Sequence, residues 1–547
     1  MTQTITVKMY KDSGYYFVDA TEVDQGAAGS GLSVKDIVDA IGTSKSATMV
    51  FGHTGTGNTT TYAFSTSEVI PSNIEVLVEE GAVISIATGV TITIGNFIDP
   101  GLSQVFSCTG TGTPVFSVGA VDWVYSEWFG ALAESAGGGT ADQAYINQAI
   151  VAAQNTKKVR LVAGYYDIAS DILASYDDMI LEGAGRTNTF LYISIANVAS
   201  FTNGVIDMSG CSEPGIQIRD LCIKFEQTDS SSKGDITVYK PAIYAVGVPR
   251  FKINRARISL AYDGIDMTGN CGGTVIDDLE LSCFNLGIEI DGALDEVFIS
   301  HLRLWPFDMT ANQDDIFFTL ASVTGINVKR CDGLAITNSM FICGTGIDFD
   351  SGGAADSFTL VDNTNFDSYS QIEVDSNHIV LFNNCWFSKA ANGFKCLDIT
   401  DGNVHVSNSY FNIATSNQTV ILYTGSDAAV QSTLTVTGCI FRTGAVDVTS
   451  IYCNENGAGV LLAHIHGNHF VRTTNTAYAN PAIKFVNNVR GSIIGNSTVD
   501  KGTGSGEFMN IDTDDYLTVV GNAGVDMAIN IPAPTNLQHS SNVPTAA

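Results

Sequence analysis

Acidic residues recur at one position of a series of short, strand-like segments. Four of the segments read Gly264-Ile-Asp-Met267, Gly287-Ile-Glu-Ile290, Gly325-Ile-Asn-Val328 and Gly346-Ile-Asp-Phe349. Because side chains alternate between the two faces of a strand, the residue between two inward apolar ones points outward. Segment by segment, this outward position is occupied by Tyr244, Asp266, Glu289, Asn327, Asp348, Glu373 and Asp398.

Two carboxyl groups that lie close together can divide the roles of acid and base. If neighbouring segments pair as parallel strands, their backbones lie about 4.8 Å apart, and repulsion between like charges raises the pKa of at least one member. One protonated and one ionised carboxyl group is the pair that glycoside hydrolysis requires. We expect Asp266, Glu289 and Asp348 as the leading acid and base candidates, with Glu280 and Glu373 behind them. A solvated acidic surface and a cation site are the other interpretations.

A second outward series could hold a sugar chain. It comprises Arg257, Glu280, Arg303, Met340, Asn365, Trp386 and Tyr410, and Trp305 lies two positions beyond Arg303. Aromatic rings offer flat faces to sugars, and arginine can bind hydroxyl groups or carboxylates. The insertion from Pro306 to Thr324 interrupts the spacing and carries Asp308, and long loops in repeat folds often carry binding function. The expected substrate-binding residues are Trp305, Trp386, Tyr410, Tyr244, Arg257, Arg303 and Asp308. Packing between subunits is the alternative role for the outward aromatic residues.

An internal repeat positions both series. Its pattern is apolar, any residue, Asn/Asp/Gly, two residues of any type and apolar, as in Ile336-Thr-Asn338-Ser-Met-Phe341. Twelve copies occur, and most begin 21 to 30 residues apart. Two or three short strands in about 25 residues match one coil of a parallel β-helix. The sequence therefore predicts an all-β, right-handed, single-stranded solenoid whose inward apolar residues stack.

The Asn position is predicted to be a corner in the left-handed backbone conformation, which asparagine and glycine tolerate. Asn338, Asn363, Asn384 and Asn408 occupy it in successive copies, and we expect their amides to form a ladder. Residues 1–127 are predicted to form a small mixed α/β cap or attachment region. Helices are expected at Leu32–Ile41 and Ala141–Gln154, the β-helix over 128–525, and a C-terminal tail over 526–547.

Composition excludes several classes of protein. The chain has 547 residues, with 57 acidic against 26 basic residues and a formal charge of -31, whereas nucleic-acid binding needs a basic surface. No uninterrupted apolar run is long enough to span a bilayer, so no membrane insertion is expected. The 11 cysteines form no CxxC pair and are expected to be buried free thiols. Neither a cofactor nor a metal site is expected.

The beginning of the repeat region resembles a known family. Glu127-Trp-Phe-Gly-Ala131, the helix at Ala141–Gln154 and the segment from Val159 to Ile168 look like the start of the pectate-lyase-like β-helix domain of bacteriophage tailspikes and some bacterial polysaccharide-degrading enzymes. Gly137-Gly-Gly-Thr-Ala-Asp142 stands where that family carries Asp-Gly and Thr-Asp-Asp elements.

This resemblance implies a homotrimer that binds a bacterial surface polysaccharide and often cleaves it. It also implies a location on the virion tail after assembly in the host cytoplasm, with residues 1–100 attached to the tail or baseplate. A protein of this family that is not part of a phage would be secreted.

Three functions are compatible with the residues. The first is a carboxylate-pair hydrolase, a polysaccharide depolymerase. The second is a polysaccharide lyase, with Arg257, Arg303 or Lys252 as the base and a cation or arginine beside the substrate uronate. The third is a non-catalytic receptor-binding spike, in which the carboxylates are solvated surface.

Overall fold

The computed structural model describes most of the chain. The described residues are 14–24, 33–55, 57–134, 136, 141–319, 322–350, 357–367, 370–375, 378–389, 395–414, 418–425, 431–444, 447–456, 459–473, 480–500, 506–512, 516–525, 527–530, 537–540 and 543–545. They form two compact units: unit 1 comprises residues 1–226 and 254–256, and unit 2 comprises residues 227–253 and 257–547. Among these described residues, no helix is both long and apolar enough to cross a bilayer.

Unit 1 begins with helix α1 (Val34–Ile41), whose N-cap is Ser33, and three small parallel sheets. This helix confirms the one predicted at Leu32–Ile41. Ser33 caps it, since Ser33 Oγ accepts a hydrogen bond from the Asp36 amide. The sheets are β1 (Tyr15–Phe17), β2 (Ala47–Phe51) and β5 (Ile74–Val78); β3 (Thr60–Phe64), β6 (Ala82–Ile86) and β8 (Phe106–Cys108); and β4 (Glu68–Ile70), β7 (Thr91–Ile94) and β9 (Thr113–Phe116).

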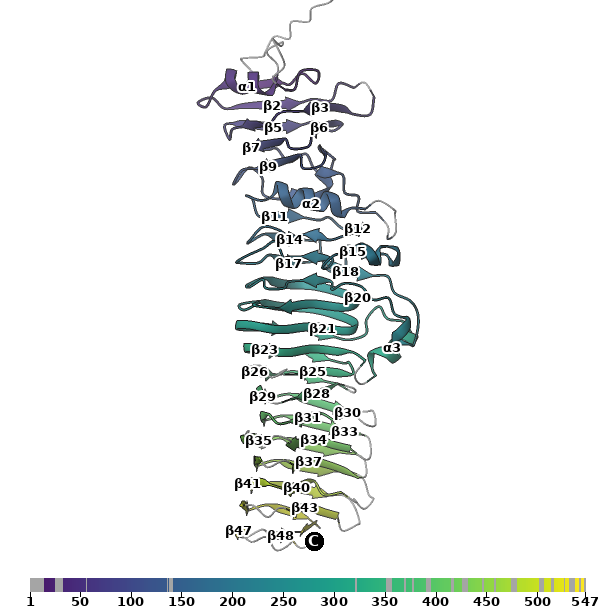
Figure 1. Ribbon diagram of the computed structural model, residues 1–547, viewed down its shortest axis with the longest axis vertical. Helices are drawn as coiled ribbons and strands as arrows, with labels where there is room; N and C mark the ends of the chain where they lie inside the picture. The colour runs from purple at the N-terminus through teal and green to yellow at the C-terminus, as the bar shows by residue number, and fades with distance from the viewer. Residues whose placement is uncertain are drawn as a thin grey trace, which may run out of the picture. The chain divides into compact units, whose positions relative to one another are not determined.

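Helix α2 (Gln143–Ala152) follows these sheets and contacts β9 on one side and the next coils on the other (Figure 1). It corresponds to the predicted second helix. The coils that follow pair in parallel as β10 (Val124–Tyr125), β11 (Lys158–Arg160), β14 (Ile180–Glu182) and β17 (Gln217–Arg219); β12 (Gly164–Asp167), β15 (Thr189–Ile193) and β18 (Cys222–Phe225); and β13 (Ile172–Leu173) and β16 (Ile206–Asp207).

The Glu127-Trp-Phe-Gly segment has a structural role in unit 1. It forms the 3-10 helix η1 (Ser126–Phe129), and all four of its side chains are buried. The Tyr166 hydroxyl donates to the Glu127 carboxylate and accepts a hydrogen bond from the Val162 amide at 2.8 Å. This motif therefore links η1 to the first coils through a buried hydrogen-bond network, and α2 packs against η1.

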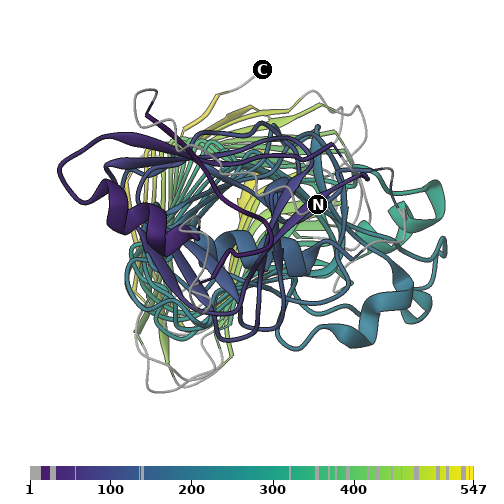
Figure 2. The ribbon, with the colours of Figure 1, turned by 90° about the horizontal axis from the view of Figure 1, so that it is seen from above.

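Unit 2 begins with long strands that pass through the corners of the coil. The long strands are β20 (Lys252–Thr268), β21 (Val275–Ser300) and β23 (Thr324–Thr337). The short strands β19 (Ile243–Tyr244) and β22 (Arg303–Leu304) belong to the same coils, and helix α3 (Ala311–Phe317) lies in the predicted insertion. Figure 2 looks along the coils and shows α3 outside the ring of strands.

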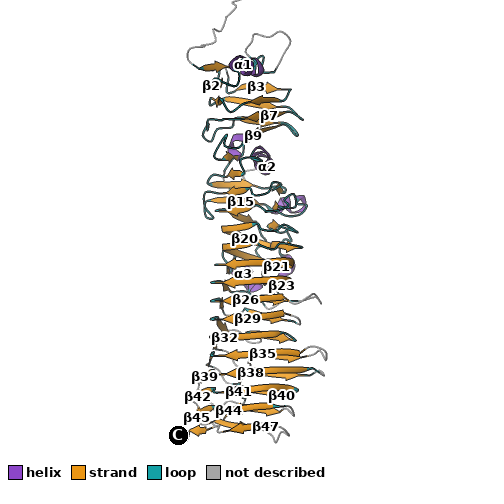
Figure 3. Ribbon diagram, turned by 90° about the vertical axis from the view of Figure 1, so that its left-hand side faces the viewer, coloured by secondary structure: helices purple, strands orange, loops and turns teal. Residues whose placement is uncertain are grey.

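Later coils of unit 2 each contribute strands to three series, and every series pairs from coil to coil; Figure 3 shows the strands stacked as orange arrows. The first face contains β26 (Ser357–Asp362), β29 (His378–Asn383), β32 (Asn403–Ser407), β35 (Gln431–Thr437), β38 (Val460–His466), β41 (Val489–Ile494), β44 (Leu517–Val520) and β47 (Leu537–Ser540). The second contains β24 (Met340–Phe341), β27 (Asn365–Phe366), β30 (Trp386–Lys389), β33 (Tyr410–Ile413), β36 (Ile440–Thr443), β39 (His469–Arg472), β42 (Ser497–Asp500), β45 (Ala523–Val525) and β48 (Val543–Thr545).

The third face contains β25 (Thr345–Phe349), β28 (Gln371–Val374), β31 (Leu397–Thr400), β34 (Gln418–Gly425), β37 (Val448–Glu455), β40 (Ile483–Asn487), β43 (Gly506–Asp512) and β46 (Met527–Asn530). Every strand pairs in parallel with its counterpart in the next coil. The predicted all-β, right-handed parallel β-helix with a small N-terminal cap is therefore confirmed. Strands β46 to β48 carry the coil pattern into the segment expected as a C-terminal tail.

The corner between the first and second faces has the predicted left-handed backbone. Asn338, Asn363, Asn384 and Asn408 have φ values of 51°, 48°, 54° and 50°. Asn363 Nδ2 donates to Asn338 Oδ1, and Asn384 Nδ2 donates to Asn363 Oδ1. Asn408 departs from the ladder, because its amide donates to Asn383 Oδ1 instead. All 11 cysteines are free, and all but Cys108 are buried.

Phenylalanine rings stack immediately inside this corner. Phe387, Phe411, Phe441 and Phe470 follow one another with centroids 4.6, 4.5 and 4.9 Å apart. This is the stacking of inward apolar residues that the repeat predicted, since equivalent residues of paired coils lie one above the other.

A second, buried asparagine ladder replaces the outer one toward the C-terminus, where glycine takes the left-handed position. Asn468, Asn496 and Asn522 lie one residue after the corner and are at most 2% exposed. Asn496 Nδ2 donates to Ile465 O and Asn522 Oδ1, and Asn496 Oδ1 accepts from the Asn468 amide. Each side chain therefore satisfies polar groups of both neighbouring coils.

We expect Asn496→Ala to lower the free energy of unfolding by roughly 3 kcal/mol, since it leaves buried polar groups on two coils without partners. Asn363→Gly, which removes a rung of the exposed ladder but tolerates the positive φ, should cost less than about 1 kcal/mol. Chemical denaturation of both variants measures the difference. Equal losses would contradict the assignment of the buried ladder as the stronger support.

Candidate functional site

The predicted carboxylate series forms a column on the third face of unit 2. Tyr244 lies opposite Asp266. Glu289 lies opposite Asn327, Asn327 opposite Asp348, Asp348 opposite Glu373, and Glu373 opposite Asp398. The structure thus brings together the residues in the predicted order, and all are half-buried. Asn327 separates Glu289 from Asp348 by one full coil.

The backbones of neighbouring coils come very close together at the glycines two residues before several outward residues of this column. A Cβ atom on Gly264 would lie 2.3 Å from Gly287 O, one on Gly287 would lie 2.3 Å from Gly325 O, and one on Gly325 would lie 2.4 Å from Gly346 O. Only glycine fits where backbones come this close. The glycine of each of these segments therefore allows the close coil packing that positions the outward residue two positions later.

Asp348 and Glu373 are the most perturbed pair of the column. Burial, reinforced by the charges of Glu373, Asp350 and Asp375, raises the pKa of Asp348 to about 7. Burial and the charge of Asp398 also raise the pKa of Glu373. Gln371 Nε2 holds Glu373 through a hydrogen bond of 3.1 Å to Oε1. Near neutral pH these two carboxyl groups can hold a single proton between them.

Two other carboxylates of the column pair with lysine residues. Lys329 Nζ lies 2.6 Å from Glu289 Oε1, and Lys395 Nζ lies 2.5 Å from Asp398 Oδ2. Asp266 Oδ1 accepts a hydrogen bond from the Thr268 amide. Within the described part of the chain, no ion pair is formed by Asp348 or Glu373. The column therefore contains one pair without a direct ion pair, Asp348 and Glu373, although the charge of Lys395 also acts on Glu373.

Glu280 lies on the second face and is bound by arginine. Arg257 donates to Glu280 Oε2 from Nε at 2.8 Å and from Nη2 at 2.5 Å, and Arg303 Nη1 lies 3.7 Å from Oε1. The Arg257 guanidinium also lies over the Phe307 ring, 4.6 Å from its centroid. Glu280 is only 6% exposed. These contacts make it a structural anchor in this geometry, although the sequence made it a candidate acid or base.

The second outward series also forms a column in the predicted order. Glu280 pairs with Arg303, Arg303 with Met340, Met340 with Asn365, Asn365 with Trp386, and Trp386 with Tyr410. Trp386 is 46% exposed and Trp305 is 37% exposed, whereas Tyr410 and Tyr244 are half-buried. The tryptophan rings thus remain open to a ligand, and Trp386 lies one coil beyond Asn365 on the face next to the carboxylate column.

The insertion folds against a second loop of the same unit. Its helix α3 starts with a capping box formed by Thr310 and Gln313. Asp229 accepts hydrogen bonds from Thr310 Oγ1 and Asn312 Nδ2, and Gln313 Nε2 donates to Thr228 O. Asp308 accepts from Ser259 Oγ at 2.8 Å. Asp308 is therefore tied to the coil by a contact that orders the loop.

A polar network under this loop was not among the predicted site residues. Lys233 Nζ donates to Asn285 Oδ1 at 2.9 Å and to Ser322 O, and Asn285 Nδ2 donates to Asp263 Oδ1 at 2.7 Å. Burial raises the pKa of Asp263 and lowers the pKa of Lys233. Asp263 directly precedes Gly264, so its place in the repeat was a signal, whereas Lys233 comes from a distant loop.

No family model matches this chain, and no curated protein matches it. Several solved structures do match this chain. Tailspike protein 3 of bacteriophage CBA120 is 14% identical with a TM-score of 0.46, covering 75% of this chain and 64% of that one, so the alignment spans under two thirds of the tailspike.

Two further solved structures have a similarly low sequence identity to this chain. The surface adhesin PfbA of Streptococcus pneumoniae is 13% identical with a TM-score of 0.36, covering 76% of this chain and 99% of that chain. The catalytic unit of the GH87 alpha-1,3-glucanase of Streptomyces thermodiastaticus is 13% identical with a TM-score of 0.38, covering 76% of this chain and 69% of that chain. All three are parallel β-helices, which is the fold that the sequence resemblance implied.

Arg257→Ala should lower the free energy of unfolding by roughly 3–5 kcal/mol, because it leaves the buried Glu280 carboxylate without the two hydrogen bonds that Arg257 donates to Oε2. Lys329→Ala is the matched control: the side chain of its partner Glu289 is 24% exposed against 8% for Glu280, so less than about 1 kcal/mol should be lost. Denaturant unfolding of the two variants gives the comparison. A loss below 1 kcal/mol for both would show that Glu280 is not held as an anchor.

Proposed function

We propose that this protein binds a polysaccharide and hydrolyses its glycosidic bonds with Asp348 and Glu373. The observation that carries the proposal is this pair on adjacent coils, neither member of which forms an ion pair with a described residue, whereas Glu289 and Asp398 of the same column each pair with a lysine. Positive charge develops on the sugar ring in the transition state of glycoside hydrolysis. An uncompensated negative site stabilises that charge better than one already paired with lysine.

The two carboxyl groups would have different roles. Asp348, with a pKa of about 7, is the group that holds the proton and would donate it to the departing glycosidic oxygen. Glu373, oriented by Gln371, would act as the ionised partner. It would either attack the sugar directly, which retains configuration, or activate a water molecule, which inverts it. Paired coils about 4.8 Å apart allow carboxyl separations suited to either outcome, depending on side-chain reach.

Exposed aromatic rings support polysaccharide binding. Trp386, Tyr410 and Trp305 lie on or beside the second face, and flat indole faces stack on sugar rings. A surface polysaccharide of bacteria is the substrate class that we propose, in line with the family resemblance. A lyase is less well supported by the geometry, because Arg257, a candidate base, is bound to Glu280 and stacked on Phe307.

A homotrimer attached to a phage tail through the N-terminal region is part of the same proposal. On the first face, outward residues of several successive coils are apolar. Phe298 is 43% exposed, Phe358 44% and Ile379 37%, and Phe358 lies opposite Ile379 on the next coil. Contact between subunits through this stripe would remove it from water.

Asp348→Asn and Glu373→Gln should each reduce depolymerisation by about 100-fold or more, because each removes one member of the acid and base pair. Asp332→Asn, an exposed carboxylate of the same unit, should retain activity. The assay incubates wild type and variants with bacterial capsules, O-antigens and acidic plant or algal polysaccharides, and reads new reducing ends together with near-ultraviolet absorbance.

The readouts separate the alternatives. New reducing ends without absorbance support hydrolysis, whereas absorbance rising with them indicates a lyase. A polysaccharide that binds tightly without yielding product would indicate a receptor-binding spike. Full activity in Asp348→Asn would contradict the assignment of the acid.

The activity of the wild-type protein should follow a bell-shaped pH profile. Asp348 must be protonated, so kcat/KM should fall as the pH rises through about 7, the raised pKa of this group. Glu373 must be ionised, so activity should also fall as the pH drops through its pKa, which lies above the ordinary 4.5. Initial rates on the cleaved polysaccharide between pH 4 and 9 measure both limbs. A rate that stays constant from pH 7 to 9 would be incompatible with an acid of this pKa.

A further inference from the structure

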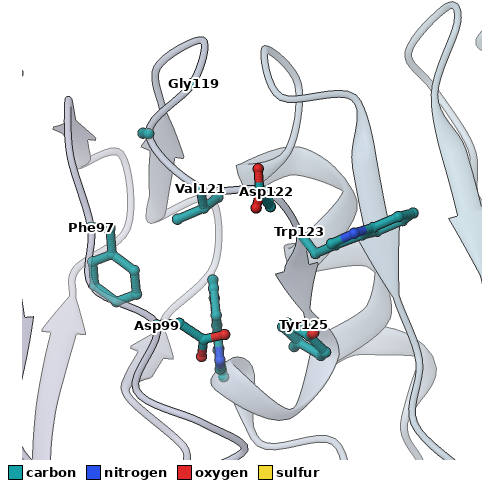
Figure 4. Close-up of a pocket in the computed structure, with 9 residues that line it drawn as sticks. Phe97, Asp99, Gly119, Val121, Asp122, Trp123 and Tyr125 are labelled. Carbon is teal, nitrogen blue, oxygen red and sulfur yellow. The ribbon is translucent and has the colours of Figure 1, made fainter.

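Unit 1 contains a hollow of about 410 Å³ whose lining includes no residue of either column. Its volume is within the range typical of small-molecule sites, roughly 300–1,000 Å³. Figure 4 shows the residues around it. The lining consists of Phe97, Asp99, Gly119, Ala120, Val121, Asp122, Trp123, Tyr125 and Trp128.

The aromatic part of the lining is rigid. Trp128 is fully buried and Phe97 is 6% exposed, with ring centroids 5.3 Å apart. Tyr125 lies 5.4 Å from Trp128, and the Trp128 indole nitrogen donates to Gly101 O at 2.7 Å. A ligand would therefore meet a preformed site, because these rings are held by packing and by a hydrogen bond.

The charged part of the lining is acidic. Asp99 and Asp122 are both exposed, and none of the nine lining residues is basic. Asp99 Oδ1 accepts one hydrogen bond, from the Gly101 amide at 2.8 Å. Asp122 forms no hydrogen bond or ion pair with any residue that the structure describes. Two carboxylates thus face solvent at the hollow beside electron-rich rings.

Basic side chains already gather on one ring of this group. Lys158 Nζ lies 5.5 Å and the Arg160 guanidinium 5.3 Å from the centroid of Trp123. Arg160 is itself paired with Glu182 at 3.1 Å. These contacts are cation–π interactions of the kind expected for the negative face of an indole.

We propose that this hollow binds a small molecule that carries an ammonium group. Carboxylates supply the opposite charge, and aromatic faces attract organic cations through their quadrupole. An amino sugar and a choline-type headgroup share this chemistry. The proposal does not depend on the Asp348–Glu373 pair, because it uses residues of the other unit.

The test titrates the full-length protein with two charged probes and their uncharged counterparts. Choline is compared with 3,3-dimethyl-1-butanol, and glucosamine with glucose, by isothermal titration calorimetry and tryptophan fluorescence. Trp123 and Trp128 are two of the four tryptophans and report on the hollow. We expect saturable binding of at least one charged probe and at least fivefold weaker binding of its counterpart.

Variants locate the binding. Asp122→Asn should weaken binding of the charged probe roughly fivefold, the effect of about 1 kcal/mol for one exposed charge pair. Glu80→Gln, an exposed carboxylate of the same unit, should leave it unchanged. The proposal is overturned if charged and uncharged probes bind equally, if neither charged probe binds at 50 mM, or if Asp122→Asn binds like wild type. Preference for glucosamine over choline would assign an amino sugar, and the reverse a choline-type headgroup.

Discussion

Parallel pairing of each coil with the next is the constraint on which the rest of unit 2 depends. Pairing satisfies the backbone groups of every face and sets the coils about 4.8 Å apart. The same spacing then applies to side chains that point outward from equivalent positions. Asp348, Glu373 and Asp398 are adjacent for that reason, although isolated carboxylates would move apart. The backbone therefore imposes their mutual repulsion, which adds to burial in raising the pKa values of Asp348 and Glu373.

The interior maintains this register. Stacked phenylalanines, buried asparagines and left-handed corners each repeat once per coil, and each tolerates little sliding of one coil over another. Phe387 and Phe411 stack immediately inside the strands that present Trp386 and Tyr410 outward. The ring positions that would meet a sugar are consequently fixed by the core rather than by flexible loops.

Much of this arrangement could be predicted from the sequence, because strand alternation and coil spacing are local and periodic. Both outward columns appear in the predicted order, and the Asn corner has the predicted backbone. Side-chain partners could not be predicted in the same way. Lys329 and Lys395 reach their carboxylates through long side chains, so the periodic pattern did not show that Glu289 and Asp398 pair with lysine while Asp348 does not.

Contacts made by distant loops also could not be predicted from the repeat pattern. Lys233 meets Asn285 across 52 residues of sequence, and this contact depends on how the loop folds over the coils. Glu280 was a candidate acid or base from its carboxyl group, yet Arg257 and Arg303 lie within reach in the same column. The alternation of Arg, Glu and Arg at that position already contained a signal for an ion pair.

The most direct test of the account is the structure of the Asp348→Asn, Glu373→Gln double variant bound to an oligosaccharide of a polysaccharide that the wild type cleaves. The account predicts a sugar chain on the third face, with one glycosidic oxygen within hydrogen-bond distance of residue 348 and the adjoining anomeric carbon facing residue 373. An oligosaccharide bound elsewhere, with neither residue in contact with a glycosidic bond, would contradict it.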